Sequence, residues 1–162
     1  PKRPYILIGH SDGGSIGLIW GSEKPPSLKG VVTEAAHVFV EPETIKGIRD
    51  ADMAFDLGKL DGLQKYHGDK TTQIFKAWSD TWLSDWFKFW NIEYLLPSVD
   101  CPLLVVQGKD DQYGTETQVE AIVSKASGDT ESFLVPNCGH APHRDQAERV
   151  IDRMAEFVEK IK

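Results

Sequence analysis

The chain has 162 residues, of which 40% are hydrophobic and 27% are charged, and its formal net charge is −7 at pH 7. This length is typical of one globular domain with a core that needs no disulfide or metal. The negative charge argues against nucleic acid or an anionic membrane surface as a partner, and no apolar run approaches the roughly 20 residues of a membrane span. No signal-type segment follows the first residues, so we expect a cytoplasmic protein.

The first predicted elements are a strand and a helix joined by a glycine-rich turn. Residues 5–8 form an apolar run typical of a buried strand, and residues 11–20 are expected to form a helix. Between them stands Gly9-His10-Ser11-Asp12-Gly13. In a strand, Gly-x-Ser-x-Gly, helix segment the turn is so sharp that the serine hydroxyl projects above the sheet. We expect the small residues Gly9 and Gly13 to let the strand and the helix pass close together.

A second strand and a long helical insertion follow. Residues 28–35 predict the strand, whereas residues 38–97 are helical in pattern and interrupted by glycines. Near the end of the insertion an aromatic residue recurs at every fourth position, at Trp78, Trp82, Trp86, Trp90 and Tyr94. Because a helix has about 3.6 residues per turn, this row cannot lie on one face of a single helix. We therefore expect two short helices, one ending near residue 82 and one starting near residue 85 with Ser84 as its N-cap.

The rest of the chain returns to alternating strands and helices. Strands are predicted at 102–107 and 131–135, and helices at 116–127 and 146–161. This alternation indicates right-handed βαβ units. The predicted fold class is α/β, with a mostly parallel sheet of about four strands flanked by helices. We expect residues 1–37 and 98–162 to form this core and residues 38–97 to form a separate helical insertion.

The cysteines and glycines give no sign of a disulfide, metal or nucleotide cofactor. Cys101 precedes one predicted strand and Cys138 follows the next, so they lie about 20 Å apart in a parallel sheet, too far for a bridge. No His/Cys cluster has ligand spacing. The turn at residues 9–13 lacks the Gly-x-Gly-x-x-Gly spacing of dinucleotide sites, and no acidic residue ends the second strand at Ala36-His37.

Chemistry-bearing residues follow the predicted strands, where parallel sheets bind ligands. A serine hydroxyl such as that of Ser11 needs a base, and the base needs an acid to orient it. Asp110 and Asp111 follow the third strand, and His140 follows the fourth, which gives the chain order Ser, Asp, His. His143 is the alternative base, although packing or capping of the next helix suits it better.

Two other histidines lie at strand ends. His10 is expected to pack beside the turn rather than react. His37 ends the second strand and is expected either to line a pocket or to make a structural hydrogen bond.

Three motifs in this order resemble the C-terminal portion of the α/β-hydrolase superfamily. They are residues 9–14, 102–111 and 139–143, and the resemblance covers nearly the whole chain. It implies that Ser11 is the nucleophile and that His140 is the general base and then the general acid. It favours Asp111 over Asp110 as the triad acid, because the family's acid usually lies three residues after the glycine that ends the strand.

The resemblance also implies a cap and a substrate class. Residues 38–97 occupy the place of the family's helical cap, and the backbone N–H of Asp12 would donate to the oxyanion. An aromatic cap implies a small to medium carboxylic ester, lactone or related acyl substrate, cleaved through an acyl-enzyme. His37, Trp82 and Trp86 are candidates to line its pocket, while the aromatic residues also suit attachment of the cap to the body. Related folds hydrolyse C–C bonds and thioesters, and some are haloperoxidases.

The resemblance further implies that strands are missing. The family's first strands precede the elbow strand, and the loop that gives the second oxyanion N–H lies among them. Three interpretations stay open: a fragment of a longer protein, a chain that pairs with a complementing N-terminal segment or a second copy through the edge of strand 5–8, or a minimal version with little activity. The alternative function is therefore a weak or inactive hydrolase-like fragment or a small-molecule-binding module.

Overall fold

The computed structural model describes residues 2–161 and divides into two compact units. One unit holds the chain up to Phe39 and from Asn91 onward, and the other is Val40–Trp90. The expected insertion, residues 38–97, is wider than the second unit at both ends. Among the described residues, no helix is long and apolar enough to cross a membrane.

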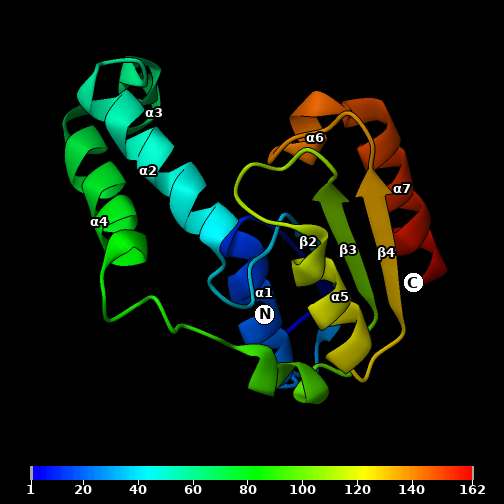
Figure 1. Ribbon diagram of the computed structural model, residues 1–162. Helices are drawn as coiled ribbons and strands as arrows, with labels where there is room; N and C mark the ends of the chain where they lie inside the picture. The colour runs from blue at the N-terminus through cyan, green and yellow to red at the C-terminus, as the bar shows by residue number, and fades with distance from the viewer. Residues whose placement is uncertain (1, 162) are drawn as a thin grey trace. The chain divides into compact units, whose positions relative to one another are not determined.

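The first unit is built on a parallel sheet of four strands in the order β1-β2-β3-β4 (Figure 1). The strands are β1 (Tyr5–His10), β2 (Leu28–Glu34), β3 (Leu103–Gly108) and β4 (Thr130–Val135). The predicted α/β class and the parallel sheet are confirmed. Strand β1 runs further than the apolar residues 5–8, because His10 still pairs with Glu34 of β2. Strand β1 forms one edge of the sheet, where Ile8 is 58% exposed.

Helices pack on both faces of this sheet. They are α1 (Asp12–Ser22), the 3-10 helix η3 (Glu93–Ser98), α5 (Glu116–Lys125), α6 (Pro142–Asp145) and α7 (Ala147–Lys160). Two glycines of α1 lie against Val31, which allows the helix to approach β2 closely. Val150, Met154 and Phe157 of α7 pack against the opposite face, which presents Val32. Figure 1 shows α5 and α7 on opposite sides of the sheet.

The second unit is helical. It contains α2 (Pro42–Asp56), η1 (Asp61–Leu63), α3 (Gln64–His67), η2 (Gly68–Lys70) and α4 (Thr71–Leu83). The helices α2 and α4 are joined by stacked rings of Phe55 and Phe75, whose centroids lie 4.1 Å apart. Asp52 of α2 accepts hydrogen bonds from Ser79 Oγ (2.7 Å) and Lys76 Nζ (2.9 Å).

The prediction of a second helix from residue 85 is wrong. Helix α4 does end at Leu83, but residues 84–89 form turns. The Ser84 hydroxyl donates back to the Thr81 carbonyl instead of capping a new helix. The N–H of Phe87 bonds to the Ser84 carbonyl and the N–H of Trp90 to the Phe87 carbonyl, a three-residue spacing that keeps the Phe87 and Trp90 rings stacked.

Candidate active site

The serine of the glycine-rich turn has a strained backbone. Ser11 stands between β1 and α1 with φ 55° and ψ −123°, a region that residues with a side chain rarely occupy. Three backbone hydrogen bonds hold it there. Its N–H donates to the Glu34 carbonyl (2.7 Å), and its carbonyl accepts from Gly14 N (2.8 Å) and Ser15 N (3.2 Å). The hydroxyl is thereby fixed at the carboxyl end of the sheet.

Glycine is needed at two positions of the elbow, but not at both of the expected ones. A Cβ at Gly9 would stand 2.2 Å from the Gly13 carbonyl oxygen, so only glycine fits there. The expectation for Gly13 is wrong, because a Cβ at that position would meet nothing within 4 Å. It is the backbone of Gly13 that approaches Gly9. The second close approach belongs to Gly14, where a Cβ would stand 2.8 Å from the Cβ of Ala36.

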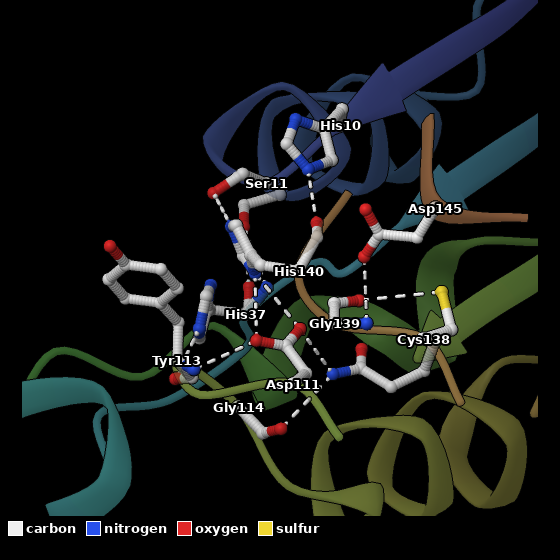
Figure 2. A network of polar contacts seen from close by, with 12 residues as sticks. His10, Ser11, His37, Asp111, Tyr113, Gly114, Cys138, Gly139, His140 and Asp145 are labelled. Carbon is white, nitrogen blue, oxygen red and sulfur yellow. Dashed lines mark hydrogen bonds and ion pairs between the residues drawn. The ribbon is translucent and has the colours of Figure 1, made fainter. Parts of the chain in front are cut away.

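The structure brings Ser11, His140 and Asp111 together in one chain of hydrogen bonds (Figure 2). The Ser11 Oγ lies 2.9 Å from His140 Nε2, and His140 Nδ1 lies 2.9 Å and 3.0 Å from the two Asp111 oxygens. A carboxylate only accepts, so the ring proton is on Nδ1 and Nε2 is free to accept from the serine hydroxyl. The Asp111 side chain is 0% exposed, whereas that of His140 is 16% exposed.

Asp111 is held by donors other than His140. Gln107 Nε2 donates to its Oδ2 (2.8 Å), and the backbone N–H of Tyr113 donates to its Oδ1 (2.8 Å). Gln107 is itself buried in β3 and also donates to the Gly114 carbonyl (3.1 Å). Asp110 is exposed, so of the two candidate acids the structure brings only Asp111 to the histidine.

The loops that carry Asp111 and His140 touch backbone to backbone. A Cβ at Gly108 would stand 2.1 Å from the Gly139 carbonyl oxygen, so a glycine at the end of β3 is a steric requirement. The N–H of Asp110 donates to the Cys138 carbonyl (2.9 Å), and Gly139 N donates to the Asp145 carboxylate (2.8 Å). These backbone contacts therefore tie the two loops to each other.

His37 makes structural hydrogen bonds near the triad. Its Nε2 donates to the Tyr113 carbonyl (2.9 Å), and its backbone exchanges hydrogen bonds with the Ser15 hydroxyl. Burial lowers the pKa of the His37 ring, and the neighbouring His140 lowers it further. The ring lies 6.1 Å from that of His140, centroid to centroid. A role in lining a substrate pocket stays a prediction.

The two tryptophans expected in the pocket differ in exposure. Trp82 is buried in the second unit, where its ring meets those of Phe87 and Trp90 edge to face at 5.0 Å and 5.6 Å. Trp86 is 73% exposed. A groove of about 750 Å³ in the same unit is lined by other residues, both apolar, such as Val40, Met53 and Phe89, and charged, such as Arg49 and Asp52. The contact of Trp82 or Trp86 with a substrate stays a prediction.

Asp12 opens α1, directly after the serine. The helix's own hydrogen-bond ladder leaves its first N–H groups without a helical acceptor, and the helix dipole makes that end favourable for negative charge. The position suits an oxyanion donor, which is a role that stays a prediction. Within residues 2–161, no group of three or more His, Cys, Asp or Glu residues could hold a metal ion.

Sequence reasoning missed two residues of this site, Gln107 and Glu34. Glu34 is the last residue of β2, and its carboxylate is buried where it accepts from the backbone N–H (2.9 Å) and Nδ1 (3.1 Å) of His143. The contact gives His143 a packing role. The expectation that no acidic residue ends the second strand is wrong, because β2 ends at Glu34 and not at residue 35. An acidic residue near the end of this apolar strand was the available signal.

A parallel sheet with a strained serine elbow after β1, an acid after β3 and a histidine after β4 defines the α/β-hydrolase fold. Residues 1–153 match the model of the alpha/beta hydrolase family. The chain belongs to this family.

Individual relatives agree on the fold. The mouse (Mus musculus) serine hydrolase BPHL is 26% identical over 159 residues, which are 93% of this chain and 54% of that protein. A serine hydrolase involved in carbazole degradation, the CarC enzyme, superposes with a TM-score of 0.75 at 20% identity, over 98% of this chain and 65% of that one. A meta-cleavage product hydrolase from Pseudomonas fluorescens IP01 superposes with a TM-score of 0.77 at 13% identity, over 99% and 66%. The chain thus spans about half to two thirds of these relatives.

Proposed function

We propose that the protein is a serine hydrolase that cleaves a small to medium carboxylic ester, lactone or related acyl substrate through an acyl-enzyme. The observation that carries the proposal is the hydrogen-bonded chain from Ser11 Oγ through His140 to the buried Asp111 carboxylate. A solvated loop histidine would not need a fully buried acid behind it. The similarity to a serine hydrolase at 26% identity supports the same chemistry.

The geometry suits a double displacement. Ser11 Oγ attacks the acyl carbon while its proton passes to His140 Nε2, and Asp111 stabilises the imidazolium that forms. The backbone N–H of Asp12 donates to the oxyanion of the tetrahedral intermediate. His140 then gives the proton to the leaving alkoxide, which departs as an alcohol. A water molecule, deprotonated by His140, next attacks the acyl-enzyme. His140 then returns this proton to Ser11 Oγ as the carboxylic acid is released.

The second unit and the free sheet edge complete the proposal. Val40–Trp90 acts as a cap. Three residues are candidates to contact the acyl group: His37, Trp82 and Trp86. A second oxyanion N–H would come from a complementing segment or a second copy that pairs with the edge of β1. The exposed Ile8 on this edge strand supports such pairing. Absence of one oxyanion donor typically costs about 10²–10³ in rate.

The test is hydrolysis of short-chain p-nitrophenyl esters, run beside labelling with a fluorophosphonate and location of the labelled peptide. Ser11→Ala and His140→Ala should abolish both signals. Ser124→Ala, which removes an exposed helical hydroxyl on α5, should change neither. A folded chain whose Ser11 is neither labelled nor required for turnover contradicts the proposal and leaves the small-molecule-binding module as the better function.

A further inference from the structure

The candidate triad is surrounded by histidines that the proposed reaction does not use. The chain has five histidines. The ring of His10 lies 5.0 Å from that of His140 and 5.1 Å from that of His143, centroid to centroid. His10 directly precedes the nucleophile, and His143 lies three residues beyond His140, in the short helix α6. Their polar contacts show what this arrangement does.

His10 holds the backbone of His140. Its Nε2 lies 2.6 Å from the His140 carbonyl oxygen, a contact that joins the end of β1 to the loop after β4 (Figure 2). A carbonyl oxygen only accepts, so His10 Nε2 carries the proton and donates. The residue before the nucleophile is therefore bonded to the backbone of the base that serves the nucleophile.

Glu34 holds the chain just beyond His140, at His143 of α6. Its Oε2 accepts from the backbone N–H of His143 (2.9 Å) and from His143 Nδ1 (3.1 Å). The backbone carbonyl of Glu34 accepts from Ser11 N at 2.7 Å. One residue thus binds the nucleophile with its main chain and the histidine loop with its side chain.

A carboxylate in this place is costly for stability. The Glu34 side chain is 5% exposed at the end of a strand whose other residues are mostly apolar or small. Removal of such a charge from water costs several kcal/mol before any partner is gained, and a well-packed apolar residue is often equally stable or better. Stability alone therefore does not account for this carboxylate, whereas its position between Ser11 and His143 does.

We propose that His10 and the Glu34–His143 pair are positioning residues that set His140 at hydrogen-bond distance from Ser11. The inference rests on the proposed serine hydrolase function. His140 itself lies in no helix or strand, and its loop contains a residue with positive φ, Asn137. Such a loop must be held from outside, because displacement of a reacting group by about 1 Å costs on the order of 10² in rate.

A matched pair of variants at His10 tests the first contact. His10→Leu removes the donor, whereas His10→Gln keeps an N–H at nearly the same reach. We expect kcat to fall about 10- to 100-fold in His10→Leu with KM within about twofold, and to recover to within about fivefold of wild type in His10→Gln. His67→Leu, at the exposed fifth histidine, should leave both constants unchanged.

The kinetic outcomes decide the proposal as follows. A kcat within twofold of wild type in His10→Leu overturns it, and so does an equal loss in His10→Gln and His10→Leu. If His10→Leu does not fold, His143→Leu replaces it, because that side chain is 40% exposed and loses its bond to Glu34 and its ring contact with His10. Glu34→Leu and His143→Leu should then reduce kcat by less together than the product of their separate effects, since both remove the hydrogen bond between the Glu34 carboxylate and His143 Nδ1.

NMR of the imidazole nitrogens tests the same contacts without turnover. The structure predicts the proton on Nε2 of His10 and on Nδ1 of His143. His10→Leu should shift and broaden the ring signals of His140, and unchanged His140 signals overturn the proposal. A chain that shows these signals but leaves Ser11 unreactive toward fluorophosphonate refutes the proposed function alone.

Discussion

Replacement of Asp111 by asparagine is the sharpest test of the candidate acid, because it changes one oxygen to an amide nitrogen at a fully buried position. Each Asp111 oxygen accepts from one donor besides His140: Oδ1 from Tyr113 N and Oδ2 from Gln107 Nε2, both at 2.8 Å. The amide oxygen of asparagine will face Tyr113 N, whose backbone position is fixed. The new NH₂ group then points at Gln107, which is itself a donor.

The side chain of Gln107 cannot turn over to repair this contact without cost. Its Nε2 also donates to the Gly114 carbonyl at 3.1 Å, and a turned amide would place oxygen against oxygen there. One buried hydrogen bond is lost in either orientation, which should lower the free energy of unfolding by about 1–3 kcal/mol. The new NH₂ can also donate to His140 Nδ1, which moves the ring proton to Nε2, where it can no longer accept from Ser11. A wrong tautomer of this kind costs up to about 10⁴ in kcat.

The assay is ester hydrolysis with thermal unfolding of each variant, and Asp110→Asn is the control. Asp110 is exposed beside the same strand end, so its replacement should change kcat less than about threefold. We expect Asp111→Asn to lose a factor of about 10²–10⁴ in kcat with the fold retained. The reasoning is refuted if Asp111→Asn keeps more than a tenth of the activity, or if Asp110→Asn loses as much.

Three further predictions concern stability and thiol reactivity. Gly9→Ala should lower the free energy of unfolding by at least about 2 kcal/mol in thermal melts. Gly13→Ala, which has open space in a helix, should be neutral or stabilising by about 0.5–1 kcal/mol. Equal effects of the two substitutions would contradict the steric argument. Burial raises the pKa of the Cys138 thiol to about 11 and also raises the pKa of the Cys101 thiol. Ellman's reagent should therefore react slowly with both thiols at neutral pH until the chain is unfolded. Fast labelling of the native protein would contradict this prediction. Burial lowers the pKa of His37, so the unfolded chain binds a proton at this ring more readily than the folded chain does. The free energy of unfolding should therefore decrease as the pH falls below about 6.5. This decrease should be smaller in His37→Gln, and an identical decrease would show that other groups cause it.

The sheet could be predicted from the sequence because its central strands stand out as continuous apolar runs. Residues 103–106 are buried on both faces, and such a run has few alternatives to a central parallel strand. The end of the second unit could not be predicted in the same way. Ser84 has the residue type of a helix cap, but the rings of Trp82, Phe87 and Trp90 pack together, and this tertiary contact favours turns over a helix.

Residue types and spacing alone left a choice between neighbouring residues in the candidate site, and only the family resemblance favoured Asp111 and His140. The sequence offers two aspartates after β3 and two histidines after β4, all with suitable chemistry. Burial separates the aspartates, since Asp110 points to solvent and Asp111 has no exposed side-chain surface.

The histidines are separated by their partners, because each binds a buried carboxylate through Nδ1: His140 binds Asp111, and His143 binds Glu34. Only His140 presents its other nitrogen to Ser11 Oγ. The two acid–histidine pairs thus differ in what they face, and the proposed function assigns proton transfer to the pair beside the serine and the positioning of His140 to the other.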